Sequence, residues 1–472
     1  MRVSTKVFAV IKVDNTGTSF EVPVIITDEG LLQSFAEYVK TYRNKSASWQ
    51  NKAVQAMQLL LEYCEVNNSA FSKPTEMFAE FSNALFTGTV DTQGDDPSGL
   101  YWKARQQDNA KALINHVAHY TDWLAKKKEN EGLRLNPYRQ ADSYEEQLNQ
   151  AAYYQRRDHV FLSHLWKTSE AQKSFQRTRM ITSKTKAKPS NSKSSDPKAF
   201  PENRIDELLE RGFVRYGKEG AHSLSERCNL QNICITLLMH YGALRISEPM
   251  HLFLEDIEPT NDGSCRVRVF HPEQGLAPDG KSTRQEYLKR NFGLKPRTEL
   301  RPSASQYSGW KEPMLTDSKN KCFEVVWFPE LAGKVFRMYW NLYLAKQRKV
   351  NPERKHPYAF TGCHGNPVAI RSYQASHARA VNLIGLVVDK LLGTTPHGHR
   401  HACGRRARDA ELDLVVIKTI MHHNSEKSSE PYTELSETNA RKKMAQMDNK
   451  ISREAKQRLQ LQIKTFEAGE QE

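Results

Sequence analysis

Apolar and polar residues alternate at the start of the chain and then take on a helical period. Every second residue is apolar on either side of Asn15-Thr16-Gly17, a pattern that predicts a β-hairpin over residues 3–26. Between residues 30 and 125, apolar residues recur every three or four positions in four separate segments. These stripes predict four short amphipathic helices that form a small bundle.

The second half of the chain mixes the two periods. A polar helical pattern over 143–173 is followed by SKTKAKPSNSKSSDPKAFP, a stretch without apolar period that is typical of a linker. Beyond it we expect helices and two strands. The helical patterns lie at 233–257, 331–348, 370–392 and 412–421, and the strand patterns at 265–270 and 322–328. The fold class that follows is mainly α with a small β-sheet, an α+β fold.

The composition patterns divide the chain into five parts. We expect an N-terminal hairpin or arm at 1–29, a helical domain at 30–180, a basic linker at 181–203, a larger mixed domain at 204–437 and a charged helical tail at 438–472. The mixed domain carries an insertion at about 271–318. Its central part is basic and rich in Pro and Gly, and it is either an extra DNA-contacting element or a solvated loop.

The charge changes this picture, because 69 basic and 55 acidic residues leave the 472-residue chain at +14. Nine basic against two acidic residues between Lys167 and Lys198 supply +7 of that excess. Such a one-sided linker favours contact with phosphates and makes a polyanion, nucleic acid first, the expected partner. No apolar run reaches membrane-spanning length, the start lacks the features of a signal peptide, and the seven cysteines have no CxxC spacing. We therefore expect a cytoplasmic protein with reduced thiols and no membrane contact.

Two clusters carry candidate chemistry. Arg245 lies in an apolar run with Glu248 three residues later, and an arginine there needs a partner for its charge. His397, His399 and His401 alternate around Arg400. Alternating histidines can form a metal site on a strand, but no cysteine or carboxylate ligand lies nearby. We expect neither a metal nor a cofactor.

The third element of the pattern is His423 followed nine residues later by Tyr432. The order Arg-x-x-Glu, His-x-x-Arg and His-x8-Tyr, with about 150 residues between the two arginines, resembles the tyrosine recombinase (phage integrase) family. The bundle at 30–125 is similar to that family's SAM-like core-binding domain. The hairpin and the insertion together resemble recombinases of a mobile-element trio from gammaproteobacteria. The resemblance implies a C-shaped clamp of two domains around its partner, double-stranded DNA.

The resemblance also implies a role for each matched residue. Tyr432 would be the nucleophile, Arg245 and Arg400 would hold the scissile phosphate, His423 would hydrogen-bond a phosphate oxygen, His397 would be the base and Glu248 would orient the first arginine. The family's leaving-group lysine precedes a strand that ends in proline, so Pro329 indicates Lys321, with Lys319 and lysines of the insertion as alternatives.

Two positions depart from the family's pattern. His422 stands where the family has glycine, and His399 replaces the usual apolar residue. Every charged catalytic position is nevertheless filled.

The function expected from these residues is site-specific DNA recombination through a covalent 3′-phosphotyrosine, for the integration or excision of a mobile element. By resemblance the enzyme would act as a homotetramer, with accessory DNA-bending or directionality proteins, on the bacterial nucleoid. The alternatives are a non-catalytic DNA-binding regulator on the same scaffold, a type IB topoisomerase and a metal-dependent nuclease. The sequence does not name the recognised sites or the preferred direction.

Overall fold

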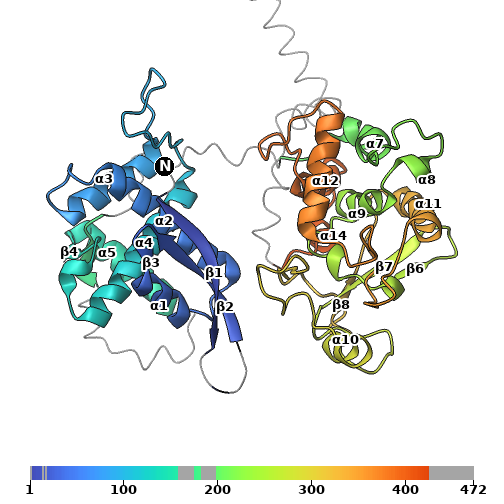
Figure 1. The fold of residues 1–472 in the computed structure, drawn as a ribbon, viewed down its shortest axis with the longest axis horizontal. Coiled ribbons are helices and arrows are strands. Elements are labelled where there is room, and N and C mark those ends of the chain that lie inside the picture. Colours follow the sequence, from blue (N-terminus) through green and yellow to red (C-terminus); the bar gives the residue numbers. More distant parts are fainter. Residues whose placement is uncertain (1–2, 13–14, 16–18, 158–174, 182–197, 425–472) are drawn as a thin grey trace, which may run out of the picture. The chain divides into compact units, whose positions relative to one another are not determined.

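The computed structural model of the chain describes residues 3–12, 15, 19–157, 175–181 and 198–424. Contacts within the chain divide it into two units, residues 1–191 and 192–472 (Figure 1). The division falls inside the segment predicted to be a linker. Tyr432 and the C-terminal tail lie outside the described residues.

The N-terminal unit is built from a small sheet and a helical bundle. β1 (Ser4–Lys12) pairs antiparallel with β2 (Ser19–Thr27), and β3 (Gly30–Leu31) extends the sheet on the other side of β2. The inward face of β2 packs into the same core as Phe35 and Tyr38 of the first helix. The hairpin predicted from the alternating pattern is therefore joined to the bundle and is not a detached arm.

Four helices form that bundle, as their apolar stripes predicted. They are α1 (Gln33–Thr41), α2 (Ala47–Val66), α3 (Pro74–Thr87) and α4 (Gln107–Lys128). Ser46 starts α2 by accepting a hydrogen bond from the Trp49 backbone N–H at 3.3 Å, a typical N-cap. Beyond a 3₁₀ turn (Glu131–Leu133), β4 (Tyr138–Gln140) pairs with β5 (Arg177–Arg179) beside α5 (Ser143–Arg157).

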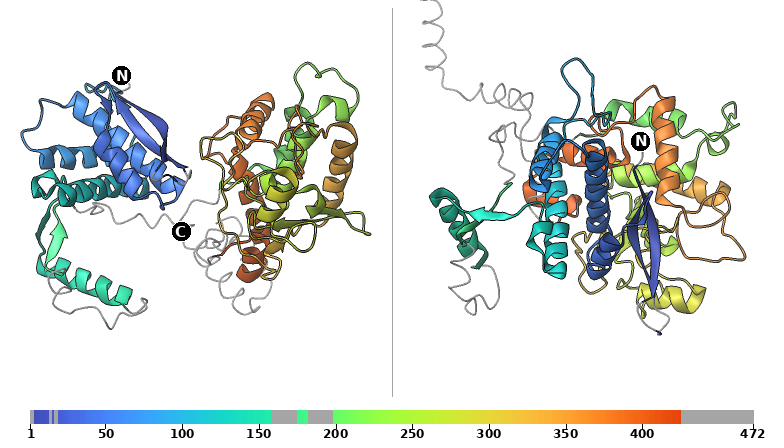
Figure 2. Two further views of the ribbon diagram at one scale, coloured as in Figure 1. Left: turned by 60° about the horizontal axis from the view of Figure 1, so that its bottom comes forward. Right: turned by 60° about the vertical axis from the view of Figure 1, so that its left-hand side comes forward.

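The C-terminal unit is organised around one buried helix. Every side chain of α9 (Leu230–His240) is buried, and α11 (Leu331–Lys346), α12 (Ile370–Leu383) and α13 (Pro396–Asp409) surround it (Figure 2). Because α9 is mostly apolar and is buried on all faces, it lies at the centre of a helical core. The remaining short helices are η3 (Glu202–Arg204), α7 (Ile205–Glu207), η4 (Leu208–Gly212), α8 (Leu224–Arg227), η5 (Pro249–His251), η6 (Leu254–Asp256) and α14 (Leu414–Ile420).

A three-stranded antiparallel sheet lies beside this helical core. β7 (Cys265–Phe270) is its central strand, between β6 (Ile257–Pro259) and β8 (Cys322–Glu324). Together with the helices, the sheet gives the predicted α+β fold. No helix within the described ranges is both long and apolar enough to cross a bilayer.

The long segment between β7 and β8 contains α10 (Arg284–Phe292), which begins with a capping box of Thr283 and Glu286. Leu288 of α10 packs against Phe253 and Tyr358 in a small cluster of its own. This part of the insertion is therefore a packed helix and not a solvated loop.

Three predicted elements are shorter than expected. The helix predicted over 233–257 ends at His240, because Ala243 takes the left-handed conformation with φ +56°. The helix predicted to reach residue 392 ends at Leu383, two residues before Gly385 with φ +75°. The strand predicted over 322–328 ends at Glu324, followed by one more backbone hydrogen bond to β7, from Val325 to the Val267 carbonyl at 2.9 Å.

Candidate active site

The loop after α9 holds the first arginine. Arg245 lies in a turn and not on a helix surface, and its backbone N–H and Nη1 donate to the two carboxylate oxygens of Glu248 at 2.7 and 2.9 Å. The Glu248 side chain is 1% exposed, whereas that of Arg245 is 18% exposed. The buried carboxylate thus fixes the arginine by two bonds and leaves one side of the guanidinium accessible to an anion.

Arg400 on α13 ties together segments that are far apart in the sequence. Its Nη1 donates to the carbonyl of Ala243 and its Nη2 to the carbonyl of Met421, at the end of α14. The side chain is almost completely buried. The left-handed Ala243 directs its carbonyl to Arg400 only two residues before Arg245, so both predicted arginines belong to one hydrogen-bonded unit.

The histidines lie in the field of these arginines. Desolvation of the ring, followed by the charges of Arg400 and Arg245, lowers the pKa of His423 to about 3. His397 keeps an exposed side, yet desolvation and neighbouring positive groups that include both arginines also lower its pKa to about 3. Both imidazoles are therefore neutral at pH 7, a state in which a ring can accept one proton and donate another. The structure brings together five predicted site residues: Arg245, Glu248, His397, Arg400 and His423.

The backbone conformation of His422 is one that glycine adopts most easily. Its φ is +49°, in the left-handed region that favours glycine, and its ring stacks on Phe323 with centroids 3.9 Å apart. Neither ring nitrogen has a hydrogen-bond partner within the described residues, although the ring is buried. The ring of His422 therefore packs as a buried side chain against Phe323, beside His423 in the sequence.

The predicted lysine stands directly before β8. Lys321 has φ +53°, its side chain is exposed and its carbonyl accepts a hydrogen bond from the His271 backbone N–H at 2.8 Å. Asp317 organises this turn by accepting from the backbone N–H groups of Lys319 and Asn320. Within the described part of the chain the Lys321 ammonium has no hydrogen bond or ion pair. Its assignment to the site stays a prediction.

His399, the second departure from the family's pattern, belongs to the core. Its Nδ1 is 3.1 Å from Nδ1 of His240, and its Nε2 is 2.8 Å from Nε2 of His377. His240 continues the chain of contacts to Glu202 at 3.3 Å, and His399 stacks on Phe200. No group of three metal-binding side chains with suitable geometry occurs among the residues that the structure describes.

The carboxylate of Glu202, at one end of this row of hydrogen-bonded histidines, determines which nitrogen of each ring carries the proton. A carboxylate only accepts, so His240 donates from Nε2 to Glu202 and must accept at Nδ1. His399 then donates from Nδ1 and accepts at Nε2 from His377. The one nitrogen left without a partner, Nδ1 of His377, is an acceptor under this assignment.

Sequence reasoning missed three contributors to the site. One is the Ala243 carbonyl, whose contact with Arg400 nothing in the sequence indicated except its position two residues before Arg245. His401 lies one helical turn after His397, and their rings are 4.4 Å apart. Lys311, in the insertion, lowers the pKa of His397 through its charge, and no motif indicated it.

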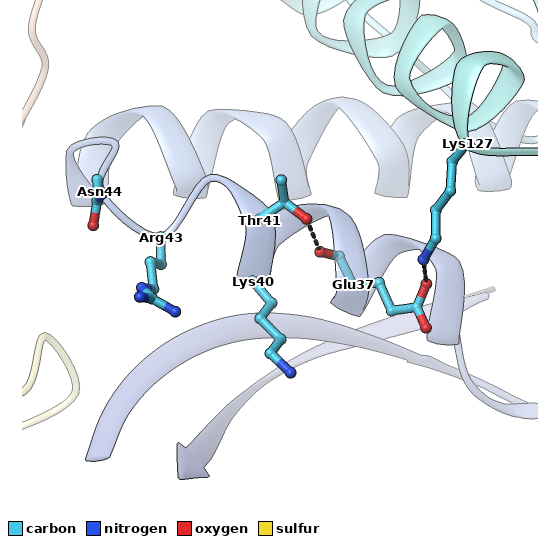
Figure 3. A pocket seen from close by; sticks show the side chains of 6 residues that line it. All are labelled: Glu37, Lys40, Thr41, Arg43, Asn44 and Lys127. Atoms are coloured by element: carbon cyan, nitrogen blue, oxygen red, sulfur yellow. Dashed lines mark hydrogen bonds and ion pairs between the residues drawn. The ribbon is translucent and has the colours of Figure 1, made fainter. Parts of the chain in front are cut away.

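The N-terminal unit has a separate cationic hollow of about 470 Å³ (Figure 3). Lys40 and Arg43 line it from α1 and the turn after it, and Lys127 reaches it from α4. The Lys127 ammonium pairs with Glu37, and this contact lowers the pKa of that carboxyl group. Lys40 and Arg43 therefore carry the net positive charge of the hollow.

Comparisons with known proteins give only distant matches, all of them to solved structures. No protein-family model matches the chain, and no curated protein sequence matches it significantly. The structure is similar to XerH site-specific recombinase bound to palindromic difH substrate, with 14% identity, 87% of this chain and 83% of that chain covered, and a TM-score of 0.46. It is also similar to the Tn1549 transposon integrase in complex with transposon right end DNA (12% identity, 88% and 98% covered, TM-score 0.43) and to XerA recombinase (14%, 88% and 96%, 0.33). At these values the likeness assigns no activity, which must be argued from the side chains.

Proposed function

We propose that the chain is a tyrosine recombinase that cleaves and rejoins DNA at specific sites through a covalent 3′-phosphotyrosine, and that it integrates or excises a mobile element. The observation that carries the proposal is the joint seating of Arg245 and Arg400 through Glu248 and the Ala243 carbonyl, with two neutral histidines in their field. This arrangement fits one phosphodiester that gains charge during reaction.

The arginines would supply the electrostatic part of catalysis. As a nucleophile attacks phosphorus, negative charge grows on the non-bridging oxygens, and fixed guanidinium donors stabilise it without reorganising. Arg400 is oriented by two backbone carbonyls and Arg245 by a buried carboxylate, so neither has to be ordered when the substrate binds. His423 would add a neutral N–H donor to a phosphate oxygen.

Tyr432 would be the nucleophile. A tyrosine hydroxyl has a pKa of about 10, so at neutral pH it needs a base, a role that we assign to His397. With a pKa of about 3 its imidazole is a weak base, so the negative charge of the bound phosphate would have to raise that pKa before the ring takes the proton. Tyr432 follows His423 by nine positions, a length of chain that reaches up to about 30 Å, so the hydroxyl can be brought to the phosphate. The new phosphotyrosine bond retains the energy of the broken phosphodiester, so rejoining would require neither ATP nor a metal.

The leaving 5′-oxygen needs a proton, and we assign this role to Lys321. It is exposed and stands at the end of the insertion, next to β8. Lys319 is the alternative within the same turn.

DNA would be held by both units. The hollow with Lys40 and Arg43, and the excess of +7 between Lys167 and Lys198, provide contacts to phosphates that carry no sequence information. Recombination joins two duplexes, so a homotetramer with one protomer per cleaved strand is the assembly that fits the chemistry. Accessory DNA-bending or directionality proteins would act on this assembly.

Covalent trapping tests the proposal directly. Labelled, nicked duplexes of randomised sequence would be incubated with the protein in EDTA and separated on a denaturing gel, and the captured sequences would then serve as the defined substrate. We expect a protein–DNA adduct with the wild type and none with Tyr432→Phe. Mass spectrometry should locate the nucleotide on the peptide that contains Tyr432.

Each other outcome has a clear meaning. Tight DNA binding without any adduct would indicate a non-catalytic regulator. An adduct accompanied by relaxation of any supercoiled plasmid, without exchange between two selected sites, would indicate a type IB topoisomerase. Cleavage that stops in EDTA would indicate a metal-dependent nuclease.

A further inference from the structure

The insertion between β7 and β8 is fastened to the loop that carries the first arginine. Arg297 is almost completely buried, yet it donates to three backbone carbonyls, those of Met250, Gln306 and Val368, at 2.7–2.8 Å. Burial lowers its pKa to about 10, so it stays charged at neutral pH. Because Met250 follows Glu248 by two residues, this arginine joins the insertion directly to the catalytic loop.

The last part of the insertion, residues 308–314, forms a strap across the site. At its start, Ser308 donates to the Ser247 carbonyl at 3.2 Å, and the Gly309 carbonyl accepts from Nε2 of His251 at 3.4 Å. At its end, the Met314 backbone N–H donates to the His422 carbonyl at 3.2 Å. The strap therefore begins beside Arg245 and Glu248 and ends beside His423.

Within the strap, Lys311 lies between two residues with defined contacts, Trp310 and Met314. The preceding Trp310 ring lies between the rings of His251 and His271, at 5.7 and 5.6 Å. Met314 is three residues further on, so the Lys311 backbone lies within about 10 Å of that anchor. The Lys311 side chain is exposed, and its positive charge helps to lower the pKa of His397.

We infer that Lys311 is a further catalytic residue, a cation that contacts a non-bridging oxygen of the phosphodiester held by Arg245 and Arg400. The strap places it between the two catalytic segments, where a third positive group can meet the charge of the reacting phosphate. This inference rests on the proposed recombinase function. Its role is distinct from that of Lys321, since it donates a hydrogen bond to the phosphate and transfers no proton to the leaving oxygen.

The test compares two substrates that differ only in the charge of the scissile group. Single-turnover adduct formation would be measured on the duplex selected by covalent trapping, with either a phosphodiester or a methylphosphonate at the scissile position. For Lys311→Met we expect a loss of about a hundredfold on the phosphodiester and a much smaller loss on the methylphosphonate, which lacks that oxygen's charge. Lys311→Arg should keep most of the activity, and Lys334→Met, which changes an exposed lysine on α11 outside the insertion, should match the wild type.

Three outcomes would overturn the inference. Unchanged cleavage by Lys311→Met would show that the side chain does not take part, and equal losses on both substrates would show a structural role. Restoration of Lys311→Met by a bridging 5′-sulfur, a leaving group that needs no proton, would show proton donation instead. If the wild type itself forms no adduct while Tyr432→Phe behaves identically, the proposed function fails as well, which is a separately recognisable result.

Discussion

At the scale of single residues, the site depends on how backbone carbonyls and one carboxylate orient two guanidinium groups. Arg400 donates hydrogen bonds to the carbonyls of Ala243 and Met421, and these two bonds fix the plane of its guanidinium group. Lysine has the same charge but a single ammonium, which cannot bridge both carbonyls and also reach a phosphate in the same geometry.

Replacement of Arg400 by lysine tests this reasoning. We expect single-turnover adduct formation to fall about a hundredfold, because one preorganised transition-state donor is misplaced. DNA affinity should change little, since most contacts that bind the duplex lie elsewhere. Arg405→Lys, a matched change on the same helix, should leave the rate unaltered. A similar loss in both variants would mean that α13 tolerates no such change and that orientation of Arg400 is not the cause.

At the scale of secondary-structure elements, three buried histidines join the helices that carry the site. His240 ends α9, His377 lies on α12 and His399 lies on α13, one residue before Arg400. Burial lowers the pKa of His377 to about 4, and that of His399 falls well below its ordinary value of about 6.5. Acid should therefore loosen the contacts among these helices.

The direction of the pH effect follows from proton counting. A histidine whose folded pKa is lowered binds fewer protons folded than unfolded, so its stabilising contribution is complete above about pH 6.5 and is lost as the pH falls towards 4. For His377 the slope is at most about 1.4 kcal/mol per pH unit. Glutamine can replace its Nε2–H donor but takes up no proton.

We therefore expect His377→Gln to make unfolding less sensitive to acid. The free energy of unfolding from urea titrations should fall less steeply between about pH 6.5 and about pH 4 in this variant than in the wild type. His364→Gln, which changes an exposed histidine, is the control and should keep the wild-type slope. Equal slopes in all three proteins would show that the pKa of His377 is the same in the folded and unfolded states.

The secondary-structure elements also show how much of the fold and of the site could be predicted from the sequence. The helical stripes, the hairpin and the residues of the arginine and histidine motifs were predictable, because each depends on spacing along the chain. The end of α9 at Ala243 and the role of the Ala243 carbonyl were not, since nothing local marks a non-glycine residue as left-handed. The packing of the insertion depends on Arg297 meeting carbonyls up to 71 positions away, which no periodicity encodes.

At the scale of the whole molecule, the net charge of +14 favours binding to a polyanion, and DNA releases counterions when cationic groups bind its phosphates. Affinity should therefore fall steeply with salt. The hollow on the N-terminal unit contributes two unpaired charges to this effect, Lys40 and Arg43, because Lys127 is partly neutralised by Glu37.

Charge reversal at the hollow tests this assignment. Lys40→Glu with Arg43→Glu should reduce the slope of log affinity against log salt by about 2, since each lost phosphate contact removes about 0.9. Lys73→Glu with Lys103→Glu changes the total charge equally at other exposed positions of the same unit and should alter the slope much less. Fluorescence anisotropy of a labelled duplex over a series of salt concentrations measures both. If the two double variants lose equally, binding responds to net charge alone. A loss confined to the first pair would mean that α1 and the turn after it face the DNA backbone, and that the N-terminal unit helps to hold the duplex on which the second unit acts.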